Sequence, residues 1–203
     1  ESVAEEFLAR LKRRMGTLRV GDPLDKNTDI GAINSAEQLA RIRELSAIGD
    51  AEGAERWSPA CDLPATGFWF APTLFTGVTQ AHRIAREEIF GPVLGVTRVA
   101  TYDEAVRLVN DNPYGNGTAL FTRDGGVARQ FQFDVRAGMV GINVPIPVPV
   151  AYYSFGGWKA SLFGDLHMYG PDGVQFYTRT KVVTSRWPDP GSSKVDLGFP
   201  QVR

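Results

Sequence analysis

Apolar side chains recur every three or four residues at the start of the chain, a spacing that predicts amphipathic helices. In the first predicted helix, Ser2 and Glu5 have the spacing of a capping box. Its apolar face would consist of Val3, Phe7, Leu8 and Leu11. A second helix is predicted to begin at Ser35, with Gln38 in the third position after it. The side chains that this helix is expected to bury are Leu39, Ile42 and Leu45.

The middle of the chain alternates between predicted strands and predicted helices. The strands are expected at 93–99, 118–122 and 139–143. One intervening helix has a capping box at Thr101 and Glu104 and ends before Asn112 and Pro113, and the other covers 127–133. This alternation is typical of an α/β layer, so the predicted fold class is α/β with a parallel sheet.

Composition narrows the classes of partner. The 22 Lys and Arg residues against 23 Asp and Glu residues give a net charge of −1, which does not favour nucleic-acid binding. The longest stretch without charged side chains, 137–158, contains three prolines at alternate positions, so no membrane span is predicted. A single cysteine excludes an internal disulfide framework and fits a reducing compartment, so we expect a cytoplasmic protein. Because the first residue is Glu1, we expect a processed or partial sequence.

Candidate nucleophiles and metal ligands are few. Cys61 lies in a predicted turn-rich loop beside Asp62. The negative charge of a neighbouring carboxylate disfavours the thiolate form that a nucleophile needs. We therefore interpret Cys61 as a loop cysteine. His82 and His167 have no second His or Cys at metal-ligand spacing, and no metal site is predicted.

The segment 86–93, Arg-Glu-Glu-Ile-Phe-Gly-Pro-Val, is the strongest candidate for binding chemistry. Glu87 and Glu88 precede an aromatic turn at Phe90, and a predicted strand follows. A carboxylate at the mouth of a sheet can accept two hydrogen bonds from a ribose diol, and a phenyl ring can pack on a nicotinamide. Taken alone, these residues are better explained as a solvated acidic pair before a strand.

Four segments together resemble motifs of the aldehyde dehydrogenase superfamily, and they occur in the family's order. They are 70–74 (Phe-Ala-Pro-Thr-Leu), 87–93, 112–115 (Asn-Pro-Tyr-Gly) and 155–161 (Phe-Gly-Gly-Trp-Lys-Ala-Ser). The resemblance extends to about Trp187. The segments 143–149, 155–159 and 162–165 further resemble the methylmalonate-semialdehyde dehydrogenase branch, which produces an acyl-CoA.

The resemblance implies a Rossmann-like catalytic domain, incomplete here, that oxidises an aldehyde through a cysteine thioester. NAD or NADP would accept the hydride, and coenzyme A would be the acyl acceptor in the branch named above. In the family pattern, the nucleophilic cysteine and the dinucleotide domain lie upstream of Ser2. We therefore expect the C-terminal section of an enzyme, assign no catalytic residue in it, and expect the isolated chain to be inactive. The alternative is a non-catalytic half that acts as a structural or assembly partner.

The resemblance assigns binding roles residue by residue. Glu88 matches the acid that binds the nicotinamide ribose hydroxyls, and Phe90 matches the aromatic residue that packs near the nicotinamide. Phe155 matches an aromatic residue of the substrate tunnel. For Phe155 and Trp158, packing of the loop against the sheet is the alternative. Asn143 matches a strand-end position near the active site and is given no chemical role.

The end of the chain departs from the α/β pattern. A short helical turn is predicted at 174–177, followed by a β-rich, basic strand at 178–187 and a loose tail. The resemblance implies that this strand joins a neighbouring subunit in a homo-oligomer, while folding back on its own domain is the alternative. The predicted organisation is thus a catalytic section at 1–177 and an oligomerisation strand with its tail at 178–203.

Overall fold

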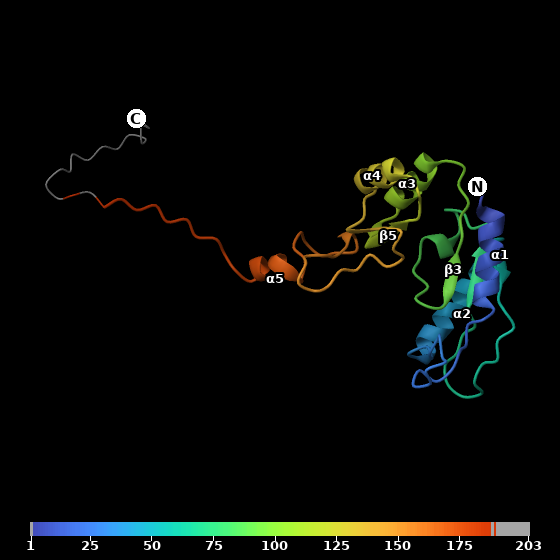
Figure 1. Ribbon diagram of the computed structural model, residues 1–203. Coiled ribbons are helices and arrows are strands. Elements are labelled where there is room, and N and C mark those ends of the chain that lie inside the picture. The colour runs from blue at the N-terminus through green and yellow to red at the C-terminus, as the bar shows by residue number, and fades with distance from the viewer. Residues whose placement is uncertain (1, 188, 190–203) are drawn as a thin grey trace.

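All four residues of strand β2 (Thr73–Thr76) are buried in the computed structural model, which describes residues 2–187 and 189 (Figure 1). This strand is the centre of a three-stranded sheet. It pairs antiparallel with β1 (Glu55–Trp57) and parallel with β3 (Val93–Gly95). Its β-branched and aromatic side chains suit a strand that is covered on both faces.

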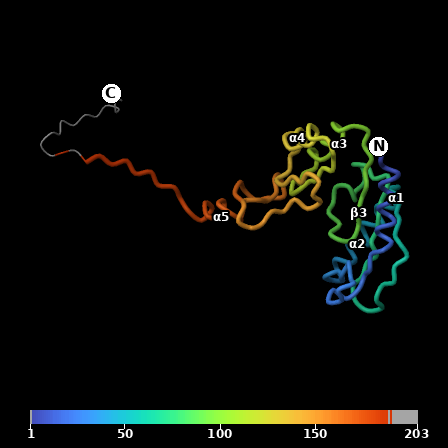
Figure 2. The backbone as a smooth tube through the Cα atoms, viewed as in Figure 1, coloured from blue at the N-terminus to red at the C-terminus, as the bar shows by residue number. Residues whose placement is uncertain are grey.

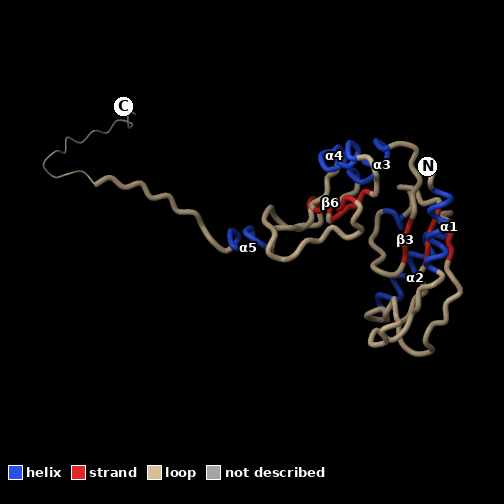
Figure 3. The backbone as a smooth tube through the Cα atoms, viewed as in Figure 1, coloured by secondary structure: helices blue, strands red, loops and turns tan. Residues whose placement is uncertain are grey.

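Helices α1 (Ala4–Met15) and α2 (Ala36–Ala51) pack beside this sheet (Figure 3). Leu74 of β2 lies in a cluster with Leu8 and Met15 of α1. The next residue, Phe75, points to the opposite face, as alternation along a strand requires, and approaches α2 at Gly49. The predicted start of α2 is confirmed, because the Ser35 hydroxyl accepts a hydrogen bond from the Gln38 amide at 3.1 Å. The predicted buried face is also confirmed, and it consists of Leu39, Ile42 and Leu45.

The predicted capping box at the start of α1 is wrong. Val3 precedes the helix with near-helical backbone angles, and no side chain caps it. Glu5 forms an ion pair with Arg98 at 2.6 Å instead of capping the helix. Phe7, expected on the buried face, is 55% exposed, and Leu8 is the buried residue of this turn.

A second group of elements follows residue 100 and has its own core. Helix α3 (Tyr102–Asp111) begins at Thr101, whose hydroxyl accepts from the Glu104 amide, and it ends before Pro113 as predicted. Strand β5 (Gly117–Leu120), helix α4 (Gly125–Asp134) and strand β6 (Met139–Ile142) form a βαβ unit with parallel pairing. Both helices contribute to a core built on Phe131, Val135 and Ala137. The short strands β4 (Tyr114–Gly115) and β7 (Trp158–Lys159) pair antiparallel beside it.

The prediction that the strands between 93 and 143 share a parallel sheet is wrong, although the α/β class and the β5–α4–β6 alternation are confirmed. Within the described residues, parallel pairing occurs in two separate sheets, β2–β3 and β5–β6, and two further pairs are antiparallel. Strand β3 pairs with the earlier strand β2, and not with β5. The apolar faces of α3 and α4 are occupied by β5 and β6, which leaves β3 in the first core.

The end of the described chain leads away from both cores (Figure 2). A 3-10 helix η1 (Arg83–Ala85) belongs to the first core, whereas α5 (Gly170–Phe176) lies at the far end, near the predicted helical turn. Residues 178–187 form no strand in the structure and do not fold back on the earlier elements. The predicted loose tail beyond residue 187 falls outside the described residues, Asp189 excepted. Among the described helices, none combines the length and the apolar character needed to cross a membrane.

Candidate functional site

A cleft of about 500 Å³ lies where the segment after η1 faces the β4–β7 pair. One side is formed by the acidic segment 85–88, and the other by the turn around β4 and the residues after β7. The lining residues are Ala85, Arg86, Glu87, Glu88, Asn112, Tyr114, Asn116, Ala160 and Ser161. Three of the four motifs that suggested the family resemblance therefore meet at one cleft.

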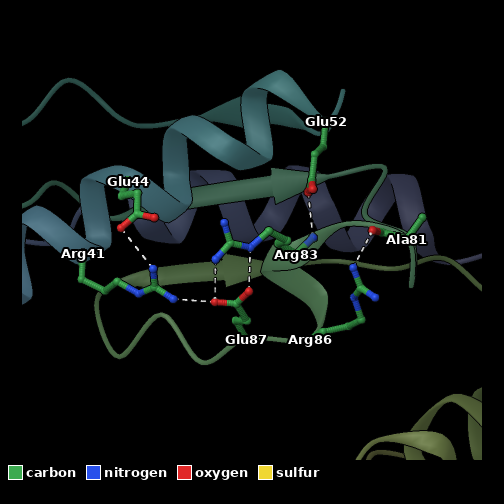
Figure 4. A network of polar contacts seen from close by, with 7 residues as sticks. All are labelled: Arg41, Glu44, Glu52, Ala81, Arg83, Arg86 and Glu87. Atoms are coloured by element: carbon green, nitrogen blue, oxygen red, sulfur yellow. Dashed lines mark hydrogen bonds and ion pairs between the residues drawn. The ribbon is translucent and has the colours of Figure 1, made fainter.

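Glu87 is held by arginines at the edge of this cleft (Figure 4). Arg83 donates from Nε to Oε1 at 2.6 Å and from its terminal nitrogen to Oε2 at 3.0 Å. Arg41 of α2 donates to the same Oε2 atom and also binds Glu44. The Arg83 hydrogen bond is the main reason that the pKa of Glu87 lies below the usual range of a glutamate. The backbone amide of Arg83 is in turn fixed by Glu52 at 2.7 Å.

Glu88 differs from its neighbour in having its carboxylate available. It is exposed and lines the cleft. Among the described residues, no hydrogen bond or ion pair engages its side chain. The structure therefore separates the acidic pair into a fixed residue, Glu87, and an unengaged acceptor, Glu88. In the sequence, only the family resemblance distinguishes these two acids.

Phe90 forms a turn that α2 holds in place. Its φ of +52° is in the left-handed region, which is uncommon for a non-glycine residue. Gln38 of α2 donates from Nε2 to the carbonyl oxygens of Ile89 at 2.9 Å and Phe90 at 3.0 Å. Gly91 lies so close to Ile42 that a Cβ there would be 2.6 Å from it. The Phe90 ring is 73% exposed and is not among the residues that line the Glu88 cleft.

Phe155 is placed apart from Glu88 and Phe90. Its ring is half-buried and stacks on Tyr169, with 4.5 Å between centroids and 2° between planes. Tyr169 precedes α5 and belongs to no sheet, so this contact is not the packing against the sheet that was the alternative for Phe155, and Phe155 does not line the cleft. Trp158 is half-exposed in β7. The substrate-tunnel role of Phe155 stays a prediction.

The far wall of the cleft is held together by hydrogen bonds between two of the family motifs, 112–115 and 155–161. The Ala160 amide donates to the Pro113 carbonyl at 3.1 Å, and the Gly115 amide donates to the Ser161 hydroxyl at 3.1 Å. These two bonds join the residues after β7 to the turn around β4. The Gly-Gly-x-Lys pattern at 156–159 marks this segment in the sequence. Its contact with the turn around β4 can be identified only from the structure, because the two segments are distant in the chain.

Asn143 has a structural role. Its side-chain oxygen accepts from the Thr122 amide at 2.9 Å, and its side-chain nitrogen donates to the Thr122 carbonyl at 3.0 Å. It adopts a φ of +57°, a region that asparagine tolerates. The paired bonds extend the β5–β6 ladder beyond Ile142, and Asn143 is not a lining residue of the cleft.

Cys61 lies in a different cleft, of about 340 Å³, that it shares with three aspartates. His82 accepts a hydrogen bond from the Thr79 amide at 3.3 Å, and His167 lies 3.4 Å from an Asp172 oxygen. Within the part of the chain that the structure describes, no three His, Cys, Asp or Glu residues are grouped to hold a metal ion. The side chains that line the cleft with Glu88 thus include two asparagines and a serine, and Cys61 lies in a different cleft.

Comparison with known proteins relates this arrangement to a family. Residues 1–183 match the pattern of the aldehyde dehydrogenase family. Malonate-semialdehyde dehydrogenase of Pseudomonas aeruginosa is 46% identical over 207 aligned positions, which include 100% of this chain and 42% of that protein.

Two solved structures match almost the whole chain. The methylmalonate-semialdehyde dehydrogenase of Oceanimonas doudoroffii has a TM-score of 0.87 at 44% identity, over 92% of this chain and 39% of that one. A Sinorhizobium meliloti structure assigned to methylmalonate-semialdehyde dehydrogenase and complexed with NAD has a TM-score of 0.88 at 44% identity. It is matched over 93% of this chain and 39% of that one. The chain therefore spans about two-fifths of the length of these relatives.

Proposed function

This chain belongs to the aldehyde dehydrogenase family, and we propose that it forms the C-terminal section of an NAD-dependent semialdehyde dehydrogenase. The substrate would be malonate semialdehyde or its methyl derivative, as in the relatives that resemble the chain. Coenzyme A would accept the acyl group, as the branch resemblance implies. The observation that carries the proposal is the unengaged Glu88 carboxylate in a cleft built from three family motifs.

The residues around Glu88 fit a nicotinamide ribose. A carboxylate without a protein partner can accept hydrogen bonds from both hydroxyls of a ribose diol. Glu87 could not do this as readily, because Arg83 and Arg41 already occupy its oxygens. The NAD complex of the Sinorhizobium meliloti relative supports NAD as the dinucleotide.

When bound, NAD would supply the acceptor for the hydride that leaves the aldehyde carbon. In this chain, Glu88 would hold the ribose hydroxyls, and the exposed ring of Phe90 would pack near the nicotinamide. The clamp of Gln38 on the carbonyls of Ile89 and Phe90 fixes the turn that joins these two residues. Phe155 would line the passage of the substrate.

We assign no catalytic nucleophile within this chain. The family reaction needs a thiolate, and Cys61 is in a different cleft from Glu88. The role proposed for these 203 residues is therefore binding and positioning. We expect the purified chain alone to show no aldehyde oxidation above a control without protein, and a Cys61→Ala variant to behave identically.

We also propose that residues 178–187 join a neighbouring subunit, so that the assembled enzyme is a homo-oligomer. This segment has no strand partner among the described residues, and most of its side chains are exposed. An unpaired β-rich segment readily adds to the edge of another sheet.

A chimera tests the proposed function. These 203 residues would replace the matching section of the Pseudomonas aeruginosa malonate-semialdehyde dehydrogenase. We expect formation of NADH and an acyl-CoA from malonate semialdehyde, NAD and coenzyme A. A folded chimera that assembles but oxidises no aldehyde would contradict the proposal and favour the non-catalytic assembly role.

A further inference from the structure

Helix α3 ends with backbone carbonyls that need hydrogen-bond donors. The last carbonyls of any helix lack partners within it. Here the chain leaves the helix at Asn112 in an extended conformation, and Pro113, which follows, has no amide hydrogen to donate. No basic residue lies in the last turn of α3 to satisfy these carbonyls from within the helix.

Lys159 supplies the missing donors from a distant segment. Its ammonium nitrogen lies 3.3 Å from the carbonyl oxygen of Val109, 3.0 Å from that of Asn110 and 3.0 Å from that of Asn112. Three acceptors match the three N–H groups of an ammonium. The positive charge also lies at the helix end where the dipole favours a cation.

The backbone around Lys159 is shaped to allow this contact. Lys159 has a φ of +55°, an uncommon conformation for a lysine. It pairs with Tyr114 in the β4–β7 ladder. Its side-chain carbons pass close to Gly115, where an added Cβ would lie 3.4 Å from Cδ of the lysine.

The same contact holds one wall of the Glu88 cleft. The carbonyl oxygen of Asn112 accepts a hydrogen bond from the Lys159 ammonium, and Asn112 lines that cleft. Ala160 and Ser161, the two residues that follow the lysine, line it as well. Resting on the function proposed above, we propose that Lys159 is a positioning residue for cofactor binding. It ties the end of α3 to the Ala160–Ser161 wall opposite Glu88, and it does not itself line the cleft.

The chemistry of the side chain makes the proposal specific. An ammonium is a compact donor that can reach three converging carbonyls, whereas a guanidinium spreads its donors in a planar fork. Lys159→Arg keeps the charge and the apolar stem but changes the donor geometry. Lys159→Met keeps most of the stem and removes both the charge and the donors.

The test uses the chimera defined above, with Lys26→Met as the matched control. Lys26 is exposed in the loop before α2 and does not line the Glu88 cleft. We expect Lys159→Met to raise the KM for NAD about tenfold, because the charged hydrogen bonds that hold the wall opposite Glu88 are lost, with a smaller change in kcat. Lys159→Arg should give a smaller rise in KM, and Lys26→Met none.

If folded Lys159→Met has an unchanged KM, the proposal is wrong. If Lys159→Met fails to fold, a wild-type KM in Lys159→Arg overturns it and a raised KM supports it.

A second measurement separates this proposal from the proposed function. If the wild-type chimera is inactive, the proposed function fails, and Lys159 is then tested in the 203-residue chain by amide hydrogen exchange. Lys159→Met should speed exchange at the Gly115 and Ala160 amides, which bond Ser161 and Pro113 across the wall. The Ala54 amide, bonded to Gly49 in the first core, should be unaffected. Equal protection of Gly115 and Ala160 in the variant and the wild type would overturn the positioning role.

Discussion

The carboxylate of Glu87 and the guanidinium of Arg83 are joined by two hydrogen bonds, at 2.6 and 3.0 Å (Figure 4). Arg83 lies four residues before Glu87 in the chain. The next acid, Glu88, has no side-chain partner in the described structure. Two adjacent glutamates in one motif therefore have different tasks. Glu87 anchors the segment to η1 and α2, and Glu88 presents its carboxylate to the cleft.

Substitution Glu88→Gln in the chimera should weaken cofactor binding without lowering thermal stability. An amide offers one acceptor oxygen where the carboxylate offers two, and it loses the charge-assisted bonds, which are worth about 1.5–3 kcal/mol. We expect a higher KM for NAD and slower hydride transfer in single-turnover kinetics. Wild-type kinetics at low NAD concentration would show that Glu88 does not hold the ribose.

Substitution Glu87→Gln should change the pH dependence of stability. Arg83 lowers the pKa of Glu87 in the folded chain, so the ion pair stabilises the fold above the unfolded glutamate pKa, about 4.3. That contribution is lost as the pH falls through the lower folded value. Denaturation of the 203-residue chain between neutral and acidic pH should therefore show a smaller acid-induced loss in Glu87→Gln than in the wild type. Glu88→Gln is the control, and an identical loss in all three proteins would contradict the prediction.

The elements that could be predicted from sequence are those set by neighbouring residues. The start of α2 depends on Ser35 and Gln38, three residues apart, and its buried face follows from the helical period. The division into separate sheets could not be predicted in this way. It depends on β3 pairing with β2 instead of β5, and nothing in the sequence of β3 itself selects between these two partners.

The site shows the same limit. Glu87 and Glu88 are neighbours with the same side chain, and they differ because Arg83 and Arg41, the latter 46 positions away, bind Glu87 alone. Lys159 contacts the end of α3 about 50 residues upstream, and its positive φ has no local sequence signal. The family resemblance identified Glu88 because it carries information on distant contacts that composition and periodicity lack.

Gly138→Ala should destabilise the second group of elements. A Cβ at this position would lie 1.9 Å from the carbonyl oxygen of Gly156, and a backbone oxygen cannot rotate away as a side chain does. We expect a loss of about 1–3 kcal/mol, measured by urea denaturation of the 203-residue chain. Gly125→Ala is the control, because no atom lies within 4 Å of an added Cβ there. Equal stability of the two variants would mean that the 156–157 loop is not packed on Gly138.

Tyr102 should remain protonated well into the alkaline range. Burial and its 2.8 Å hydrogen bond to Asp134 raise the pKa of Tyr102 to about 12. Because the neutral phenol is favoured in the folded chain, its contribution to stability is present below the unfolded pKa, about 10, and is lost as the pH rises toward 12. Ultraviolet titration of the wild type against Tyr102→Phe should show one late-titrating tyrosine missing from the variant. A difference spectrum that develops near pH 10 would contradict this.

Removing residues from Lys181 onward should reduce the size of the assembled chimera. Val182, Val183 and Trp187 are 86, 76 and 91% exposed, and the segment that carries them has no strand partner in the described structure. Apolar side chains on an unpaired β-rich segment are a liability unless another sheet edge covers them, and main-chain hydrogen bonds to that edge would supply the affinity. A truncation after Trp187 keeps residues 178–187 and is the matched control. Sedimentation velocity should show smaller species for the truncation at Lys181 and the full oligomer for the control. An unchanged oligomer in the shorter truncation would mean that another surface assembles the enzyme, and a monomeric untruncated chimera would remove the proposed assembly role of residues 178–187.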